Sequence, residues 1–121
     1  LLKNIAVVGM SSNKQRPSYI VAIYMINNGY NITPVNPNYK TIDGMECFPN
    51  LESLKIKIDT VTIFRKSEFV MPIVKSAIRI KTKTIWMQDN VINQKAENLA
   101  KAAGMKVVMD DCFPRRHQLI K

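Results

Sequence analysis

The residues best suited to chemistry stand together in one short loop near the start of the chain. An apolar run at residues 5–8 is followed by Gly9 and by a polar, basic loop that reaches Pro17. Gly9 allows a sharp turn and a close approach of ligand to backbone, and Pro17 suits the first turn of a helix, where its missing N–H needs no partner. The free N–H groups of such a helix start attract an anion, and Lys14 and Arg16 add positive charge beside it. The loop therefore predicts a site for a nucleotide-type phosphate, against the simpler alternative of a strand-to-helix turn with no ligand.

The elements that must position this loop alternate between strand and helix patterns. Strands are expected at residues 4–9, 31–35, 60–64, 84–88 and 106–109, and helices at about 17–28, 68–80 and 93–103. Residues 39–51 and the tail after the last strand are expected to be irregular, with a turn at Asp43-Gly44 and a short helical turn at 51–54. Five apolar strands separated by helices imply a parallel sheet covered on both faces. The predicted fold is an α/β, Rossmann-like three-layer sandwich with a five-stranded parallel sheet, formed by residues 1–121 as one domain.

Two of the expected helices carry an apolar stripe that indicates their buried side. These stripes are Val70, Ile73, Val74, Ala77 and Ile78 in the second helix and Ala96, Leu99, Ala100 and Ala103 in the third. The start of the second helix stays open, because Ser67 is a candidate cap while Pro72 is a candidate restart one turn later.

Sheets of this kind bind ligands beyond the carboxyl ends of their strands. The expected strand ends carry residues 9–16, Asn36-Pro37, Phe64-Arg65, 88–90 and 110–112, which one crevice would gather. Asn36-Pro37 also reads as a simple strand stop, and Arg65 as half of an ion pair.

Composition and motifs narrow the ligand class. The formal net charge of +9 over 121 residues favours anionic partners. A dinucleotide site would show G-x-G-x-x-G and an acid near the end of the second strand, and a P-loop would show G-x-x-x-x-G-K-[ST]; the chain has neither pattern. The chain shows no apolar run of membrane length and no signal-peptide pattern, so a cytoplasmic location is expected. Cys47 and Cys112 are expected to be free thiols, and no metal site is expected.

Five segments then follow one pattern in order along the chain, at residues 9–18, 34–37, 61–65, 85–88 and 107–112. In this ordered set the chain resembles the small stand-alone CoA-binding proteins of bacteria, which are similar to the CoA-binding domain of the succinyl-CoA synthetase alpha subunit. The resemblance implies a Rossmann-like fold and binding of coenzyme A (CoA) or an acyl-CoA. It implies no established reaction, so a ligand-binding protein is expected rather than an enzyme.

The resemblance also assigns parts of CoA to parts of this chain. It implies the pyrophosphate near the loop of residues 9–18, the adenosine against Asn36 and Pro37, and the pantetheine arm against Gln88, with Phe64 and Arg65 bordering the crevice. The expected ligand-binding residues are Gly9, Met10, Ser11, Ser12, Lys14, Arg16, Pro17, Ser18, Asn36, Pro37, Phe64, Arg65 and Gln88.

The chain departs from the family pattern at two places. Asn90 stands where the family has a glycine, and asparagine tolerates the left-handed geometry of that turn. The tail reads Asp110-Asp111-Cys112 and later Arg116-His117, where the family has Asp-Arg-Cys and Glu-His. Cys112 and His117 form a conceivable nucleophile and base, but with no third group to orient them a structural or solvent-facing role is favoured.

Two other function classes remain open. One is an NAD(H)-sensing Rossmann module, and the other is a basic module that contacts nucleic acid through residues 81–83 and 115–117. Few aromatic residues interleave with those basic stretches, so a solvated basic surface is favoured there. The sequence names no protein partner.

Overall fold

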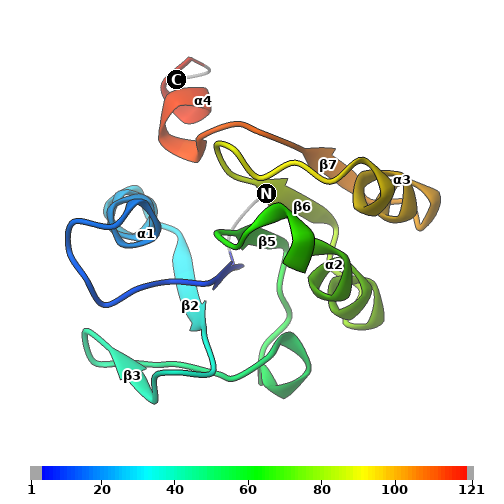
Figure 1. Cartoon of the computed structure of the whole chain (residues 1–121). Coiled ribbons are helices and arrows are strands. Elements are labelled where there is room, and N and C mark those ends of the chain that lie inside the picture. Colours follow the sequence, from blue (N-terminus) through cyan, green and yellow to red (C-terminus); the bar gives the residue numbers. More distant parts are fainter. Residues whose placement is uncertain (1–3, 120–121) are drawn as a thin grey trace.

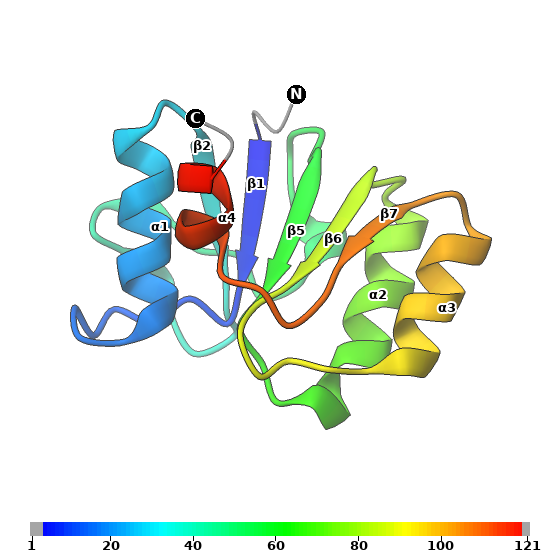
Figure 2. The ribbon, with the colours of Figure 1, turned by 90° about the horizontal axis from the view of Figure 1, so that it is seen from above.

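The computed structural model describes residues 4–119, which form a five-stranded parallel sheet between two layers of helices (Figure 1). The strands are β1 (Asn4–Val8), β2 (Asn31–Val35), β5 (Thr60–Ile63), β6 (Thr84–Met87) and β7 (Lys106–Val108), in the spatial order β2-β1-β5-β6-β7. The helices are α1 (Pro17–Asn27) and α4 (Phe113–Leu119) on one face and α2 (Val70–Arg79) and α3 (Gln94–Ala102) on the other, as Figure 2 shows. The predicted α/β, Rossmann-like three-layer sandwich is confirmed.

Alternate residues of the central strands face opposite layers, because side chains in a strand point to opposite sides in turn. Ile5 and Val7 of β1 pack under α1, whereas Ala6 and Val8 pack under α2 and α3. Both sets are buried, which explains why β1 reads as a continuous apolar run and not as an alternating one.

The carboxyl ends of the strands are level with one another, and this aligns the residues that follow them. Val8 pairs with Val35 on one side and with Ile63 on the other, and Ile63 pairs with Met87. The residues one step beyond these strand ends are Gly9, Asn36, Phe64 and Gln88. Parallel register therefore brings predicted site residues from four separate segments to one edge of the sheet.

The helix stripes are mostly as predicted. Val70, Val74, Ala77, Ala96 and Ala100 are buried, while Ile73, Ile78 and Leu99 are partly buried against the same core. Ala103 is exposed, contrary to prediction, because α3 has already ended at Ala102. A 3-10 turn, η2 (Ser67–Phe69), precedes α2, and neither the expected Ser67 cap nor a restart at Pro72 occurs.

Two segments expected to be irregular have regular structure. Residues 41–46 form a small antiparallel hairpin of β3 (Thr41–Ile42) and β4 (Met45–Glu46), with the predicted Asp43-Gly44 turn at its tip. The 3-10 turn η1 (Leu51–Ser53) follows it, where a short helical turn was expected. The tail forms α4, because Phe113 is buried among aromatic side chains and holds the segment against α1.

No helix within residues 4–119 combines the length and the apolar character that a membrane crossing requires.

Candidate functional site

Gly9 follows β1, the strand at which the order of the sheet reverses: the chain continues from β1 to β2 on one side and returns to β5 on the other. Its strand, β1, is flanked by β2 on one side and β5 on the other, and this switch point is where open α/β sheets bind ligands. Gly9 has φ +87°, and a Cβ placed there would press on the carbonyl oxygen of Phe64 and lie 3.1 Å from Cδ of Arg65. Glycine is therefore the residue that fits both the backbone angle and the narrow space.

The loop after Gly9 is held in shape by its own hydrogen bonds. The N–H of Ser11 donates to Oγ of Ser18 at 2.9 Å, and the N–H of Asn13 donates to Oγ of Ser11 at 3.0 Å. The N–H of Arg16 donates to the carbonyl of Asn13 at 3.0 Å. Ser18 is buried and engaged in this way, so the loop is organised before any ligand arrives.

Within the described chain, the start of α1 is uncapped and exposed. Arg16 is the residue that precedes the helix and Pro17 is its first residue, as predicted, and no side chain among residues 4–119 caps this end. Both residues are exposed. Pro17 has no N–H, and the N–H groups of Tyr19 and Ile20 donate to the carbonyl of Arg16. The helix dipole and the Arg16 guanidinium are therefore the groups that favour a bound anion at this place.

A central cavity of about 390 Å³ lies between this loop and the loops that follow β2, β5 and β6. Its lining residues are Gly9, Ser11, Arg16, Pro17, Ser18, Asn36, Asn38, Tyr39, Phe64, Asp89 and Val91. The structure therefore brings together seven of the predicted residues, from three different loops.

Asn36 connects two of those loops through its side chain and backbone. Its Nδ2 donates to the carbonyl of Met10 at 3.1 Å, and its N–H donates to the carbonyl of Phe48 at 2.8 Å. The Met10 side chain is fully buried in the core under α1. Met10 therefore contributes to this edge of the sheet through its backbone, and the Asn36 side chain ties the first loop to the second.

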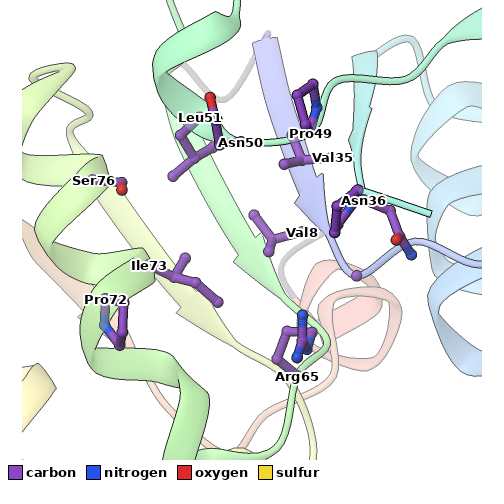
Figure 3. A pocket seen from close by; sticks show the side chains of 12 residues that line it. Val8, Val35, Asn36, Pro49, Asn50, Leu51, Arg65, Pro72, Ile73 and Ser76 are labelled. Atoms are coloured by element: carbon purple, nitrogen blue, oxygen red, sulfur yellow. The ribbon is translucent and has the colours of Figure 1, made fainter. Parts of the chain in front are cut away.

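A second cavity of about 200 Å³ adjoins the central one, and Gly9 and Asn36 line both. Figure 3 shows Val8, Val35 and Leu51 at its inner wall, with Ile73 on α2 opposite. Its rim is formed by Pro37, Pro49, Asn50, Arg65, Pro72 and Ser76. The cavity is thus a mainly apolar recess with polar edges, a form that suits a flat ring system.

Arg65 stands at the border of this recess, as predicted. Its guanidinium carbon lies 4.9 Å from the centre of the Phe69 ring, which is the geometry of a cation–π contact. The Arg65 side chain thus passes Gly9 with its Cδ and places its guanidinium over Phe69.

Gln88 is almost fully enclosed, with 3% of its surface exposed. Its Oε1 accepts the N–H of Phe113 at 3.3 Å, which ties the end of β6 to the start of α4. Gln88 also lines a third cavity, of about 280 Å³, which shares Pro17, Phe64 and Asp89 with the central cavity. The central cavity therefore adjoins both of the others, and the row of these three cavities along the carboxyl edge of the sheet is called the groove.

Of the predicted residues, Met10, Ser12 and Lys14 line none of the three cavities. Lys14 is exposed on the loop away from the lining of the central cavity. Ser12 is exposed as well, but hydrogen bonding from the Ser12 and Ser11 hydroxyls, together with the charge of Arg16, lowers the pKa of Tyr39.

Tyr39 and Asp89 line the central cavity but were not among the expected ligand-binding residues, although Asp89 lay in the expected crevice. Tyr39 follows the Asn36-Pro37 pair in the same loop, and this proximity was the available signal. Asp89 is held by Arg115, whose Nη2 lies 2.7 Å from its carboxylate. Only the folded tail brings Arg115 to Asp89, so no local pattern indicated the pair.

The tail is more ordered than expected, and its arginines form ion pairs. Arg115 and Arg116 both pair with Asp111, at 2.9 and 2.7 Å, so these charges are compensated. His117 stacks on the Phe113 ring, and its Nδ1 lies 2.6 Å from the Tyr24 hydroxyl. The tail is therefore a helix whose two arginines are ion-paired and still solvent-exposed, and in which His117 has a packing role.

The loops after β5, β6 and β7 are also joined to one another. The N–H of Asn90 donates to Asp110 at 2.7 Å, and the N–H of Ile92 donates to Oγ of Ser67 at 2.9 Å. Asn90 has φ +66°, so the left-handed turn expected at this departure from the family pattern is present.

The sequence profile of a family described as the CoA binding domain matches residues 3–118. This chain belongs to the CoA-binding domain family. Membership supports CoA as the general class of ligand, and it agrees with a groove that has a basic loop at its centre.

The CoA-binding domain is similar to several known proteins over nearly its whole length. It is 33% identical to YneT, an uncharacterized protein of Bacillus subtilis (strain 168), over 98% of this chain and 88% of YneT. A hypothetical protein from Pyrococcus horikoshii OT3 superposes with a TM-score of 0.95 at 36% identity, covering 98% of this chain and 83% of the other. The dinucleotide forming acetyl-coenzyme A synthetase 1 of Ca. Korarchaeum cryptofilum, in its complex with phosphate and ADP, shares the fold at a TM-score of 0.77 and 21% identity, over 89% of this chain and 26% of that one.

Proposed function

We propose that this chain binds CoA or an acyl-CoA in the groove along the carboxyl edge of its sheet, with the phosphates at the loop of residues 9–18. The observation that carries the proposal is the convergence of the open α1 start and the Arg16 guanidinium on the central cavity. A helix N-terminus and a guanidinium are groups that bind phosphate oxygens strongly. The positions of the two adjoining cavities then determine where the adenosine and the pantetheine arm of CoA extend.

The adenosine end is proposed for the apolar recess beside Asn36, Pro37 and Arg65. This recess adjoins the phosphate position through Gly9 and Asn36. Its apolar inner wall suits the faces of a purine, and its polar rim suits the ring nitrogens. The pantetheine arm then extends the other way, past Phe64 and toward Gln88, through the cavity that shares lining residues with the phosphate position.

The proposed role is ligand binding without catalysis by the chain's own residues. The purified protein is expected neither to hydrolyse acyl-CoA nor to ligate CoA to an acid at more than about 1 per second, a low value for an enzyme. Turnover above that rate that is lost on Cys112→Ala contradicts this part of the proposal.

The test of the ligand and its orientation is calorimetry with CoA, NAD and pantetheine on three forms of the protein. Arg16→Ala is expected to weaken CoA binding about ten- to a hundredfold, because a charge-assisted hydrogen bond contributes about 1.5–3 kcal/mol. Lys14→Ala is the matched control, since it removes the same charge from the same loop but lies outside the cavity lining. The control is expected to cost clearly less affinity.

Three results would contradict the proposal. NAD binding as tightly as CoA refutes the ligand class. Equal losses of CoA affinity in Arg16→Ala and Lys14→Ala indicate a general effect of surface charge. Equal weakening of pantetheine and CoA by Arg16→Ala means that Arg16 supports the fold and not the phosphates.

A further inference from the structure

The third cavity is lined by a free thiol, Cys112, which also packs against the edge of the core under α1. Cys112 lines this cavity together with Phe64, Val21 and Gln88, and it is a partly buried, free thiol within the described part of the chain. Cys47, by contrast, is buried, and its Sγ lies 3.4 Å from the carbonyl of Asn36, to which it donates. The two thiols of the chain therefore differ in access to the groove.

Gln88 supplies an independent sign that this cavity receives a polar ligand. Its Oε1 accepts the Phe113 N–H, which fixes which way the amide lies. Its Nε2 is buried and has no hydrogen-bond partner anywhere in residues 4–119. An amide donor that is buried without a partner costs free energy, so the site is complete only when an acceptor such as a carbonyl oxygen lies against it.

The chemistry of CoA matches this sequence of cavities. If the proposed function holds, the phosphates lie in the central cavity, and the arm that continues past Phe64 carries amide carbonyls and ends in a thiol. An amide carbonyl of the arm then supplies the acceptor that Gln88 Nε2 lacks, and the terminal sulfur lies in the cavity that Cys112 lines. Two sulfur atoms that meet in one cavity can be joined by a disulfide.

We propose that Cys112 is a site of covalent CoA attachment through a mixed disulfide. The reaction is thiol–disulfide exchange with a CoA disulfide as the co-reactant. The Cys112 thiolate attacks one sulfur of the CoA disulfide, the new Sγ–S bond forms as the S–S bond breaks, and one CoA leaves as its thiolate, which takes up a proton. One CoA is thereby left joined to Cys112, and a thiol reductant reverses the step.

The test compares the rate of labelling by CoA disulfide with that by glutathione disulfide, using the reduced full chain and intact-protein mass. Labelling by CoA disulfide is expected to be at least about tenfold faster and to saturate, because binding in the groove raises the local concentration of the reacting sulfur. Adenosine 3′,5′-bisphosphate, which fills only the nucleotide part of the groove, is expected to remove the advantage. Cys47→Ser is expected to react as the wild type does, and Cys112→Ser is expected not to gain CoA.

The outcomes separate this inference from the proposed function. A gain of CoA on Cys47, or on Cys112→Ser, overturns the inference. Equal rates with both disulfides, in a protein that binds CoA by calorimetry, also overturn it and leave the proposed function standing. Absence of both CoA binding and preferential labelling refutes the two together.

Discussion

Replacing Gly9 with alanine is expected to destabilise the protein more than the same change at another glycine with the same backbone angle. Gly9 has φ +87°, and the added methyl group would press on the carbonyl oxygen of Phe64. Neither strand can move away easily. The N–H of Gly9 donates to Val35 at 2.8 Å, and the N–H of Phe64 donates to Val8 at 2.9 Å.

The expected cost has two parts. An alanine in the left-handed region costs roughly 1–2 kcal/mol. Overpacking against a backbone that cannot relax adds about 1–3 kcal/mol. We therefore expect a loss of about 3 kcal/mol in the free energy of unfolding, which for a domain of this size lowers Tm by roughly 10 °C.

Gly29→Ala is the matched control for the backbone term. Gly29 has φ +89°, and an added Cβ there meets nothing within 4 Å. Its expected cost is the left-handed term alone, about 1 kcal/mol. Urea unfolding of the wild type and both variants measures the difference, which we expect to be about 2 kcal/mol in excess for Gly9→Ala. Equal destabilisation of the two variants would refute the close approach of β1 and β5 as the reason for a glycine at this position.

Three further predictions concern charges near the groove. Arg115→Ala leaves the Asp89 carboxylate uncompensated on the cavity wall. Calorimetry is expected to show CoA binding weakened about two- to fivefold, which corresponds to the free energy of an exposed ion pair. Adding Asp89→Asn to this variant should restore the affinity. The Ser12 and Ser11 hydroxyls and the charge of Arg16 lower the pKa of Tyr39. CoA affinity should therefore fall as pH rises through that pKa, because ionised Tyr39 puts a negative charge on the cavity wall. CoA affinity measured against pH in Tyr39→Phe should not show this fall. Burial raises the pKa of Asp111, but hydrogen bonds from its arginine partners outweigh burial and lower it. Stability from this group is thus present above about pH 4 and lost as pH falls through the lower folded-state pKa, and Asp111→Asn should show a weaker acid dependence of Tm.

Much of the fold follows from local signals in the chain. The continuous apolar runs predict buried parallel strands, and Gly9, Gly29 and Pro17 stand where the backbone turns or a helix begins, because their conformational preferences act within one or two residues. The first loop of the site was predictable for the same reason. Its glycine, its basic residues and its helix start are neighbours in the sequence.

The remaining features depend on contacts between segments that are distant in the sequence. The strand order β2-β1-β5-β6-β7 decides which loops face one another, and no local pattern encodes that order. This strand order places the Asn36 side chain where it donates a hydrogen bond to the carbonyl of Met10, and it places Tyr39 in the wall of the central cavity. The tail illustrates the same point, since its seven-residue helix α4 is too short to be stable alone and forms by packing Phe113 into the core.

Some features of the site therefore follow from the sequence alone, and others depend on the tertiary structure. The amino-acid sequence by itself determined the strands, their ends and the glycine, basic residues and helix start of the first loop, because these depend on residue type and short spacing. Only the tertiary structure decided that Gln88 carries an unpartnered buried donor within the described chain, that Arg115 pairs with Asp89, and that Cys112 lines the third cavity. The physical reason is that burial, charge compensation and cavity walls arise from groups brought together across the sheet, which depends on the packing of the whole chain.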